Sequence, residues 1–172
     1  MKTTVAFPRR PSLYAGLAYT ILVAFLALFV ASCAEDTIWW ELPPDMTDEE
    51  RSAFGEGLEL CNAIAIRQQF IAPDGDGTHH VFLRRPENMV NGPHTTGEMS
   101  RSFGVMNLVR GQPHKQLIAV VAHEGLHAAG MRAHHEARGI MNASGLRLET
   151  PEDPVAFTEA DREACRRESA CR

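Results

Sequence analysis

The sequence lacks the cysteine spacing that a thiolate zinc site uses. Its four cysteines include no CxxC pair, and such pairs are the usual source of structural zinc ligands. Setting aside Cys33, which closes the N-terminal segment, three thiols remain: Cys61, Cys165 and Cys171. In an oxidising compartment two of these would form a disulfide and leave one thiol over. Cys61 can pair with either of the others, or Cys165 with Cys171.

The chain also lacks an excess of positive charge. Its 17 Lys and Arg against 22 Asp and Glu give a net charge of -5. Lys2, Arg9 and Arg10 lie in the N-terminal segment, so the chain beyond that segment is more acidic still. Binding to nucleic acid depends on basic residues that neutralise phosphates. We therefore exclude nucleic acid as a partner.

Long apolar runs are scarce, and the one that stands out covers residues 13–31. A basic start, an apolar middle and small residues at the end are typical of a secretory signal. Its end, Val30-Ala31-Ser32-Cys33, resembles the bacterial lipobox, in which the chain is cut before a lipidated cysteine. The alternative is an uncleaved membrane anchor, for which the run is just long enough.

The lipobox resemblance implies a division of the chain into three parts. Residues 1–32 would be the signal peptide, 33–45 a lipidated tether, and 46–172 a single domain. The protein would be lipid-anchored at Cys33 in the bacterial cell envelope. Ala34 in place of an aspartate favours the outer membrane where the host has one. We expect a monomer.

Local signals within the domain predict both helices and strands. Thr47 and Glu50 have the spacing of a capping box, which opens a core helix running to about Ala65. A second capping signal, residues 158–161, opens a last helix. Residues 79–84 read as a strand, and residues 99–109 as one bent strand or two short ones. These elements predict an α+β fold.

Two polar segments are predicted to be turn or loop. Pro73-Asp74-Gly75-Asp76-Gly77 begins like a calcium loop, but His79 stands where that pattern requires glycine, so a turn is favoured. Residues 87–98 are polar and turn-rich, and His94 within them is expected at the surface.

The residues that carry chemistry are His123, Glu124 and His127. The two histidines are four apart, so on a helix they project from one face and can share a metal ion. Glu124 lies beside them, where it can take a proton from a metal-activated water. The apolar run at residues 117–122 precedes them and predicts a buried helix, which Pro113 would start.

A third ligand is expected after the helix. Gly130 suits a left-handed C-cap, where the chain turns back. His134 is the nearest candidate ligand, and His135 is the alternative. Beyond them, Gly139-Ile140-Met141 can form a tight turn that places a methionine beneath the ligands.

The run from His123 to Met141 resembles the metzincin clan of zinc endopeptidases, with its HExxHxxGxxH motif and Met-turn, and within the clan the matrixin-type branch. One position departs from the pattern, because Ala133 stands where the family has its third histidine. A one-residue bulge after Gly130 would bring His134 to the metal. A backbone that follows the family strictly would leave the site one ligand short.

The resemblance implies a single small domain with a mixed sheet, a long active-site helix, a Met-turn at Met141 and a C-terminal helix. It implies one catalytic Zn²⁺ held by three histidines, and hydrolysis of peptide bonds in a protein or peptide substrate with Glu124 as general base. An edge strand within residues 78–104 would pair with that substrate.

Two rival functions remain open. In a gluzincin-like protease the third ligand would be a glutamate on a later helix, Glu159 or Glu163. In a catalytically inactive metal-binding or scaffold lipoprotein, the same fold would persist without turnover, because of Ala133.

Overall fold

The computed structural model describes most of the chain after the N-terminal segment. The described residues are 36–64, 68–71, 78–132, 134–137, 139–142 and 155–168. Residues 1–32, Cys33, the turn at 73–77 and Ala133 lie outside them, so the expectations placed there stay predictions. Within the described ranges, no helix has both the length and the apolar character needed to cross a membrane.

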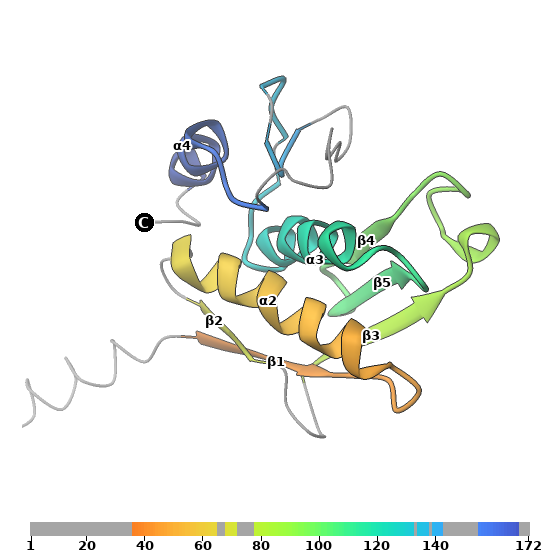
Figure 1. Ribbon diagram of the computed structural model, residues 1–172. Helices are drawn as coiled ribbons and strands as arrows, with labels where there is room; N and C mark the ends of the chain where they lie inside the picture. The colour runs from red at the N-terminus through yellow and green to blue at the C-terminus, as the bar shows by residue number, and fades with distance from the viewer. Residues whose placement is uncertain are drawn as a thin grey trace, which may run out of the picture. The chain divides into compact units, whose positions relative to one another are not determined.

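A five-stranded mixed sheet forms one layer, with strand order β2-β1-β3-β5-β4. Parallel pairs join β1 to β2, β1 to β3 and β3 to β5, and β4 runs antiparallel to β5. The strands are β1 (Asp36–Glu41), β2 (Gln68–Ile71), β3 (His79–Arg84), β4 (Gly97–Ser100) and β5 (Val105–Val109). Figure 1 shows β4 at the far end of the sheet from β2. The α+β class and the mixed sheet agree with the sequence prediction.

Among the described residues, three α-helices accompany the sheet: α2 (Asp48–Ile64), α3 (His114–Ala128) and α4 (Glu159–Arg167), with a short 3-10 turn, η1 (Pro86–Asn88). The predicted capping box opens α2, since the Glu50 amide donates to Thr47 Oγ1 and the Thr47 amide donates to Glu50 Oε2. The predicted strand at 79–84 is β3. The segment 99–109 forms parts of two short strands, β4 and β5, and the turn between them contains Gly104, with φ 61°.

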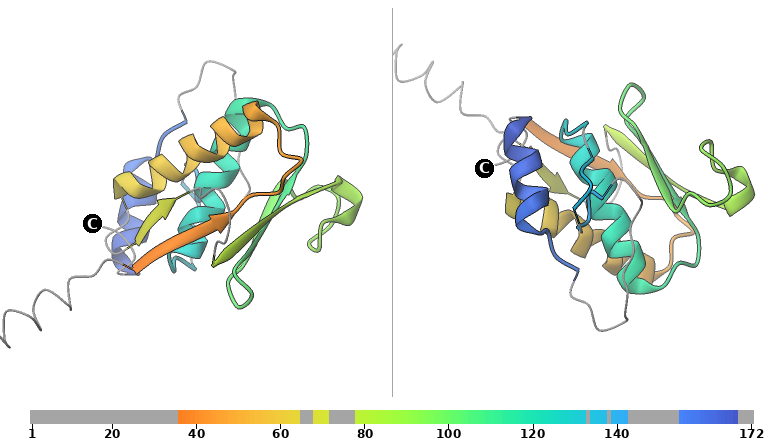
Figure 2. Two further views of the ribbon diagram at one scale, coloured as in Figure 1. Left: turned by 90° about the horizontal axis from the view of Figure 1, so that it is seen from below. Right: turned by 90° about the horizontal axis from the view of Figure 1, so that it is seen from above.

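Helices α2 and α3 approach so closely that two glycines are required at their crossing. A Cβ on Gly57 would lie 2.7 Å from Val121 Cβ, and a Cβ on Gly125 would lie 2.7 Å from Cys61 Sγ. Figure 2 shows the two helices against each other from both directions. Side chains from both helices join those of β1, β3 and β5 in one apolar core. The site helix α3 therefore packs against both α2 and the sheet.

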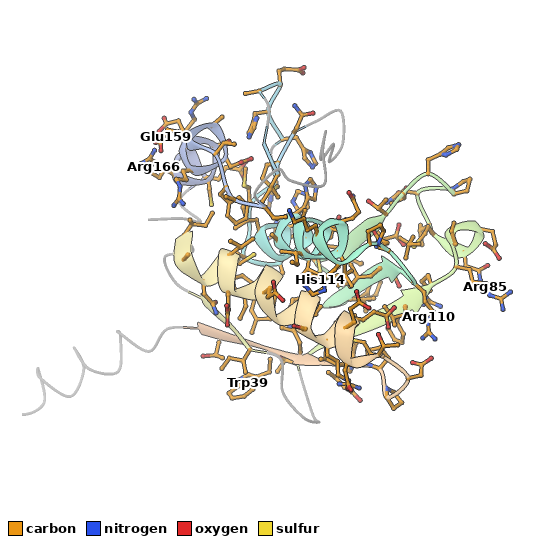
Figure 3. The ribbon with its side chains drawn as sticks, viewed as in Figure 1. Trp39, Arg85, Arg110, His114, Glu159 and Arg166 are labelled. Carbon is orange, nitrogen blue, oxygen red and sulfur yellow. The ribbon has the colours of Figure 1, made fainter. Side chains whose placement is uncertain are left out.

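Strand β1 corrects the expectation that residues 33–45 form a tether. Trp40 is fully buried, with its ring 5.8 Å from Phe54 edge-on and 5.2 Å from the ring of His79. Trp39 is 43% exposed, and Figure 3 shows its side chain on the side of β1 away from α2. The tether prediction relied on the acidic residues and the flanking prolines of this segment. Burial of one large aromatic ring stabilises the segment as a strand in spite of them.

Candidate metal centre

The site is built at the C-terminal end of α3. The helix follows Pro113, and residues 117–122 are all buried, as the apolar run predicted. It ends with Gly130 at φ 115°. The Gly130 amide donates to the His127 carbonyl at 3.1 Å and the Met131 amide donates to the Leu126 carbonyl at 3.0 Å. This pair of bonds is the Schellman arrangement, and it reverses the chain so that the following residues return toward α3.

Three imidazoles meet where the chain returns. The Nε2 atoms of His123, His127 and His134 lie 3.1 to 3.2 Å from one another. Their ring centroids are separated by 4.8 to 5.0 Å. Among the described residues, this is the group of histidines, cysteines and carboxylates whose donor atoms lie close enough together to hold a metal ion. The structure therefore brings His134 to the two histidines of the helix.

The hydrogen bonds of the other ring nitrogens decide what this cluster can hold. His123 Nδ1 donates to the Ile140 carbonyl at 2.7 Å, and His127 Nδ1 donates to the Met131 carbonyl at 2.8 Å. A carbonyl only accepts, so in each neutral ring the proton is on Nδ1 and Nε2 carries a bare lone pair. Two unprotonated nitrogens 3.2 Å apart cannot form a hydrogen bond with each other. They fit a shared cation, and three imidazole nitrogens are a donor set that suits zinc.

Protonation of the ligands is disfavoured as well. Burial lowers the pKa of His123 to about 4, with the neighbouring imidazoles of His127 and His134 acting in the same direction and the Ile140 hydrogen bond opposing them. The pKa of His127 is also lowered, mainly by burial, with smaller contributions from His134 and Arg101. Neutral imidazole is the form that binds metal.

His135 has a different partner. Its Nε2 lies 2.8 Å from Asp161 Oδ1, and the ring is largely buried against that carboxylate. His134 and His135 are adjacent in sequence, yet only the first faces His123 and His127. The structure thus distinguishes the two candidates that the sequence left open, by placing the His135 ring on a carboxylate instead of the cluster.

Glu124 is 6% exposed and lies between the helix and the edge strand. Burial raises its pKa to about 8, the charge of Glu98 adds to this, and a hydrogen bond from the Met99 amide acts in the opposite direction. A divalent cation held by the neighbouring histidines would also favour the carboxylate, because a positive charge stabilises the ionised form. The group is positioned to exchange a proton beside the cluster.

Asp161, fully buried, organises the segment behind the ligands. Its Oδ1 accepts from the Met141 amide at 2.7 Å and from His135, and its Oδ2 accepts from the Ile140 amide at 3.2 Å and from Thr158. Burial works to raise the pKa of Asp161, but the hydrogen bonds from Met141, Thr158 and His135 outweigh it and lower the pKa. The carboxylate joins the start of α4 to the turn that carries Met141.

That turn has no room for a side chain at Gly139. A Cβ there would lie 2.5 Å from Asp161 Oδ2, so only glycine lets the turn reach the carboxylate. The turn then presents the Ile140 carbonyl to His123, and Met141 is 0% exposed within the core. Sequence reasoning identified Gly139-Ile140-Met141 as a turn. It assigned Asp161 only to a helix cap, and the capping pattern of Thr158 and Asp161 was the one signal available.

Strand β4 is the edge strand expected within residues 78–104. One side pairs with β5, and no described strand pairs with the other. Its Glu98 side chain is buried and accepts from the amides of Val90 and Asn91 and from Asn107 Nδ2, at 3.1 Å each. These bonds hold the loop before β4 onto the sheet. Sequence reasoning missed Glu98, which lies in a stretch that reads as polar loop.

A cavity of about 190 Å³ opens beside Glu124, between α3 and the start of β4. Its lining residues are His94, Thr95, Thr96, Gly97, Val120, His123 and Glu124. His94 is exposed, as the sequence predicted, but it also lines this cavity. A Cβ on Gly97 would lie 2.3 Å from Val120 Cγ1, so the close contact of β4 with α3 requires glycine.

The glutamates of the gluzincin alternative lie elsewhere. Glu159 pairs with Arg166 on α4, and Glu163 lies 3.4 Å from both Arg166 and Arg167. Figure 3 shows Glu159 and Arg166 together on α4. Both carboxylates are exposed, and neither belongs to the histidine cluster. The structure does not bring them to His123.

The cysteines resolve part of the pairing question. Cys61 is a buried free thiol whose Sγ donates to the Ala122 carbonyl at 3.3 Å, so the pairings predicted for it are wrong. Its thiol lies in the α2–α3 crossing, against Gly125. Cys165 is in a disulfide whose partner lies outside the described residues.

Comparison with known proteins adds a weak structural likeness. No protein-family model matches the chain, and no curated protein matches it by sequence. Among solved structures, the chain is similar to high choriolytic enzyme 1, a hatching-enzyme zinc protease from the medaka fish Oryzias latipes, with a TM-score of 0.39 and 16% identity. The match covers 58% of this chain and 45% of that one. A likeness of this size does not identify an activity, which the site itself has to support.

Proposed function

We propose that the protein is a zinc-dependent endopeptidase of metzincin type, similar to the matrixin branch. One observation carries this proposal. The bare Nε2 atoms of His123 and His127 converge with Nε2 of His134 at 3.1 to 3.2 Å, next to a buried glutamate. Three imidazoles leave coordination positions open for water and substrate, which is typical of catalytic and not of structural zinc.

The residues have distinct roles in the proposed reaction. Zinc, when bound, supplies Lewis acidity that lowers the pKa of water and polarises a peptide carbonyl. Glu124 accepts a proton from the attacking water and returns it to the amine that leaves. The Met99 amide donates a hydrogen bond to Glu124 and so orients the carboxylate.

The substrate would bind along β4. The open side of this strand offers backbone groups to an extended peptide, so that the peptide adds one more strand to the sheet. Met99 belongs to β4 and donates to Glu124, so a peptide on this edge lies beside the base. The cavity lined by Val120, His123 and Glu124 would take one substrate side chain.

We also propose that the protein is attached to the bacterial envelope through a lipid on Cys33, after removal of residues 1–32. The support is the lipobox-like run Val30-Ala31-Ser32-Cys33 behind an apolar segment. Metabolic labelling with a radioactive fatty acid tests it: the wild-type protein should be labelled and the Cys33→Ser variant should not.

Metal content and proteolysis, measured on the same preparation, test the enzyme proposal. The purified protein should contain about one zinc per chain and cleave casein, and a chelator should abolish cleavage. Glu124→Gln should retain zinc and lower the rate by about 10²- to 10⁴-fold, as expected for loss of a general base.

Zinc without any cleavage, in both the wild-type protein and Glu124→Gln, would support the inactive metal-binding alternative instead. Absence of zinc from the wild-type protein under saturating metal would overturn both functions. Zinc binding that survives His134→Ala unchanged would reopen the gluzincin alternative.

A further inference from the structure

We propose that Arg101 selects substrates with an acidic residue on the N-terminal side of the cleaved bond. This inference rests on the proposed peptidase function and names a substrate class for it. It depends on the position of Arg101 at the end of the edge strand and on the way a peptide would lie along that strand.

Arg101 directly follows Ser100, the last residue of β4, and is exposed. Its guanidinium reaches to the α3 C-cap, where Nη2 lies 3.7 Å from the position that a Cβ on Gly130 would occupy. Gly130 joins the helix that carries His127 to the segment that carries His134. The guanidinium therefore lies beside the metal cluster, near enough to His127 to act on that imidazole electrostatically.

The charge of Arg101 is available to a ligand. Within the described part of the chain no carboxylate pairs with it, whereas Arg110 pairs with Asp45 and Arg166 with Glu159. Glu168, whose charge also acts on His127, accepts from the Arg132 amide at 2.6 Å. An exposed guanidinium without a carboxylate partner, next to a substrate edge, favours a bound carboxylate through charge-assisted hydrogen bonds.

The direction of the peptide follows from strand pairing. Antiparallel pairing is the more stable arrangement per residue, and it would place the N-terminal part of the substrate at the end of β4, by Arg101. The start of β4, at Gly97, faces the cavity beside Glu124. At about 3.3 Å per residue, Arg101 reaches substrate side chains within about three residues before the cleaved bond. An aspartate or glutamate there would meet the guanidinium.

The test uses pairs of fluorogenic peptides that differ only by glutamate or glutamine at one of these positions. The wild-type protein should cleave the better glutamate peptide with a kcat/KM about fivefold above that of its glutamine partner. Arg101→Gln should lower only the glutamate rate and equalise the pair, and Arg101→Glu should prefer a lysine peptide. The wild-type preference should decrease at high salt.

Arg85→Gln is the matched control, since it removes the same charge from another exposed arginine, labelled in Figure 3 near η1. It should keep the wild-type preference. Arg101→Gln should still contain about one zinc per chain under saturating metal, and its thermal unfolding should equal that of the wild-type protein, because the side chain is exposed and is not a ligand. Equal rates for the glutamate and glutamine peptides in the wild-type protein would overturn the inference, and so would a preference that survives Arg101→Gln.

A binding measurement tests the specificity proposed for Arg101 independently of catalytic turnover. Fluorescence anisotropy of the same labelled peptides on zinc-loaded Glu124→Gln measures the preference without catalysis. If no peptide is cleaved but the glutamate peptide binds more tightly, and the double variant with Arg101→Gln loses that difference, the specificity holds while turnover fails. Equal Kd values for both peptides would overturn the specificity regardless of turnover.

Discussion

Nδ1 of His123 lies 2.7 Å from the carbonyl oxygen of Ile140, although 17 positions separate the two residues. This bond ties the site helix to the turn around Met141. The same turn donates two amides to Asp161 on α4. The orientation of the first ligand ring is therefore set by a carboxylate that lies outside the histidine cluster and does not touch it.

Asp161→Asn should weaken both the fold and the metal site. An amide has one oxygen, so its NH₂ group would face backbone donors that the buried carboxylate now satisfies. Unsatisfied buried donors cost about 1–3 kcal/mol each, and we expect the free energy of unfolding to decrease by about 3 kcal/mol. Zinc affinity should decrease about 10- to 100-fold, as for loss of other outer-shell partners of a ligand. Urea unfolding without zinc and competition with a fluorescent chelator measure the two effects.

Glu163→Gln is the control for this prediction, because it removes an exposed carboxylate from the same helix. Its unfolding free energy should change by less than about 0.5 kcal/mol. If Asp161→Asn had an effect as small as the control, Asp161 would not organise the turn.

His134→Ala and His135→Ala should show opposite patterns. His134 is exposed and contributes only to the cluster, so its loss should decrease zinc affinity more than 100-fold, beyond the usual effect of an outer-shell change. The metal-free protein should unfold with little change in free energy. His135→Ala should instead lower that free energy by about 1–2 kcal/mol, through loss of the bond to Asp161. A larger zinc defect in His135→Ala would contradict the ligand set.

The features that could be predicted from the sequence are local. The histidine spacing, the apolar run at residues 117–122 and the C-cap at Gly130 all depend on residues within a few turns of one another. The capping pattern of Thr47 and Glu50 likewise identified the start of α2. Each of these signals reports the backbone conformation of its own segment, so no distant partner is needed to read it.

The features that could not be predicted depend on partners far away in the chain. Trp40 belongs to a strand because Phe54 and His79 enclose it, and its own acidic neighbours gave no such signal. Asp161 reads as a surface acid, yet it is buried against the Met141 and Ile140 amides, 20 and 21 positions away. Glu98 is bonded to the amides of Val90 and Asn91, only 8 and 7 positions away, but these belong to a loop whose path no local signal predicts. His134 and His135 could not be distinguished from the sequence for the same reason. The backbone conformation after Gly130 decides which of the two adjacent rings faces His123 and His127.

Acid should destabilise the metal-free Glu124→Gln protein between about pH 6.5 and pH 4. The folded-state pKa values of His123 and His127 are lowered from their unfolded value of about 6.5,. The unfolded chain therefore binds protons first, and stability decreases as the pH falls through this range. Glu124→Gln is the background because the Glu124 pKa is raised to about 8 in the folded state, so protonation of this carboxylate would stabilise the fold as the pH falls and oppose the histidines. The Asp161 pKa is lowered from 3.8, so its contribution is lost only at more acidic pH. Urea unfolding in EDTA at pH 7.5 and pH 5 measures the effect.

His123→Ala should flatten that pH dependence, since it removes the imidazole whose pKa is lowered to about 4. If the metal-free Glu124→Gln protein were equally stable at both pH values, the buried imidazoles would not be responsible. In the presence of zinc, the free energy of unfolding should depend more steeply on pH, because protons compete with the metal for the same nitrogens.

Two glycines of α2 test whether the close helix crossing positions the site. A Cβ on Gly57 would lie 2.7 Å from Val121 Cβ and 2.8 Å from the Ile118 carbonyl oxygen, so the α3 backbone itself would have to move. A Cβ on Gly55 would meet nothing within 4 Å. Gly57→Ala should therefore lower the free energy of unfolding by about 1–3 kcal/mol, whereas Gly55→Ala should raise it by about 0.5–1 kcal/mol through helix propensity.

Because α3 carries His123 and its movement would displace that ring, Gly57→Ala should also weaken zinc binding, and Gly55→Ala should not. Equal zinc affinities in the two variants, despite different stabilities, would show that the ligand geometry tolerates a shift of α3 and does not depend on the crossing.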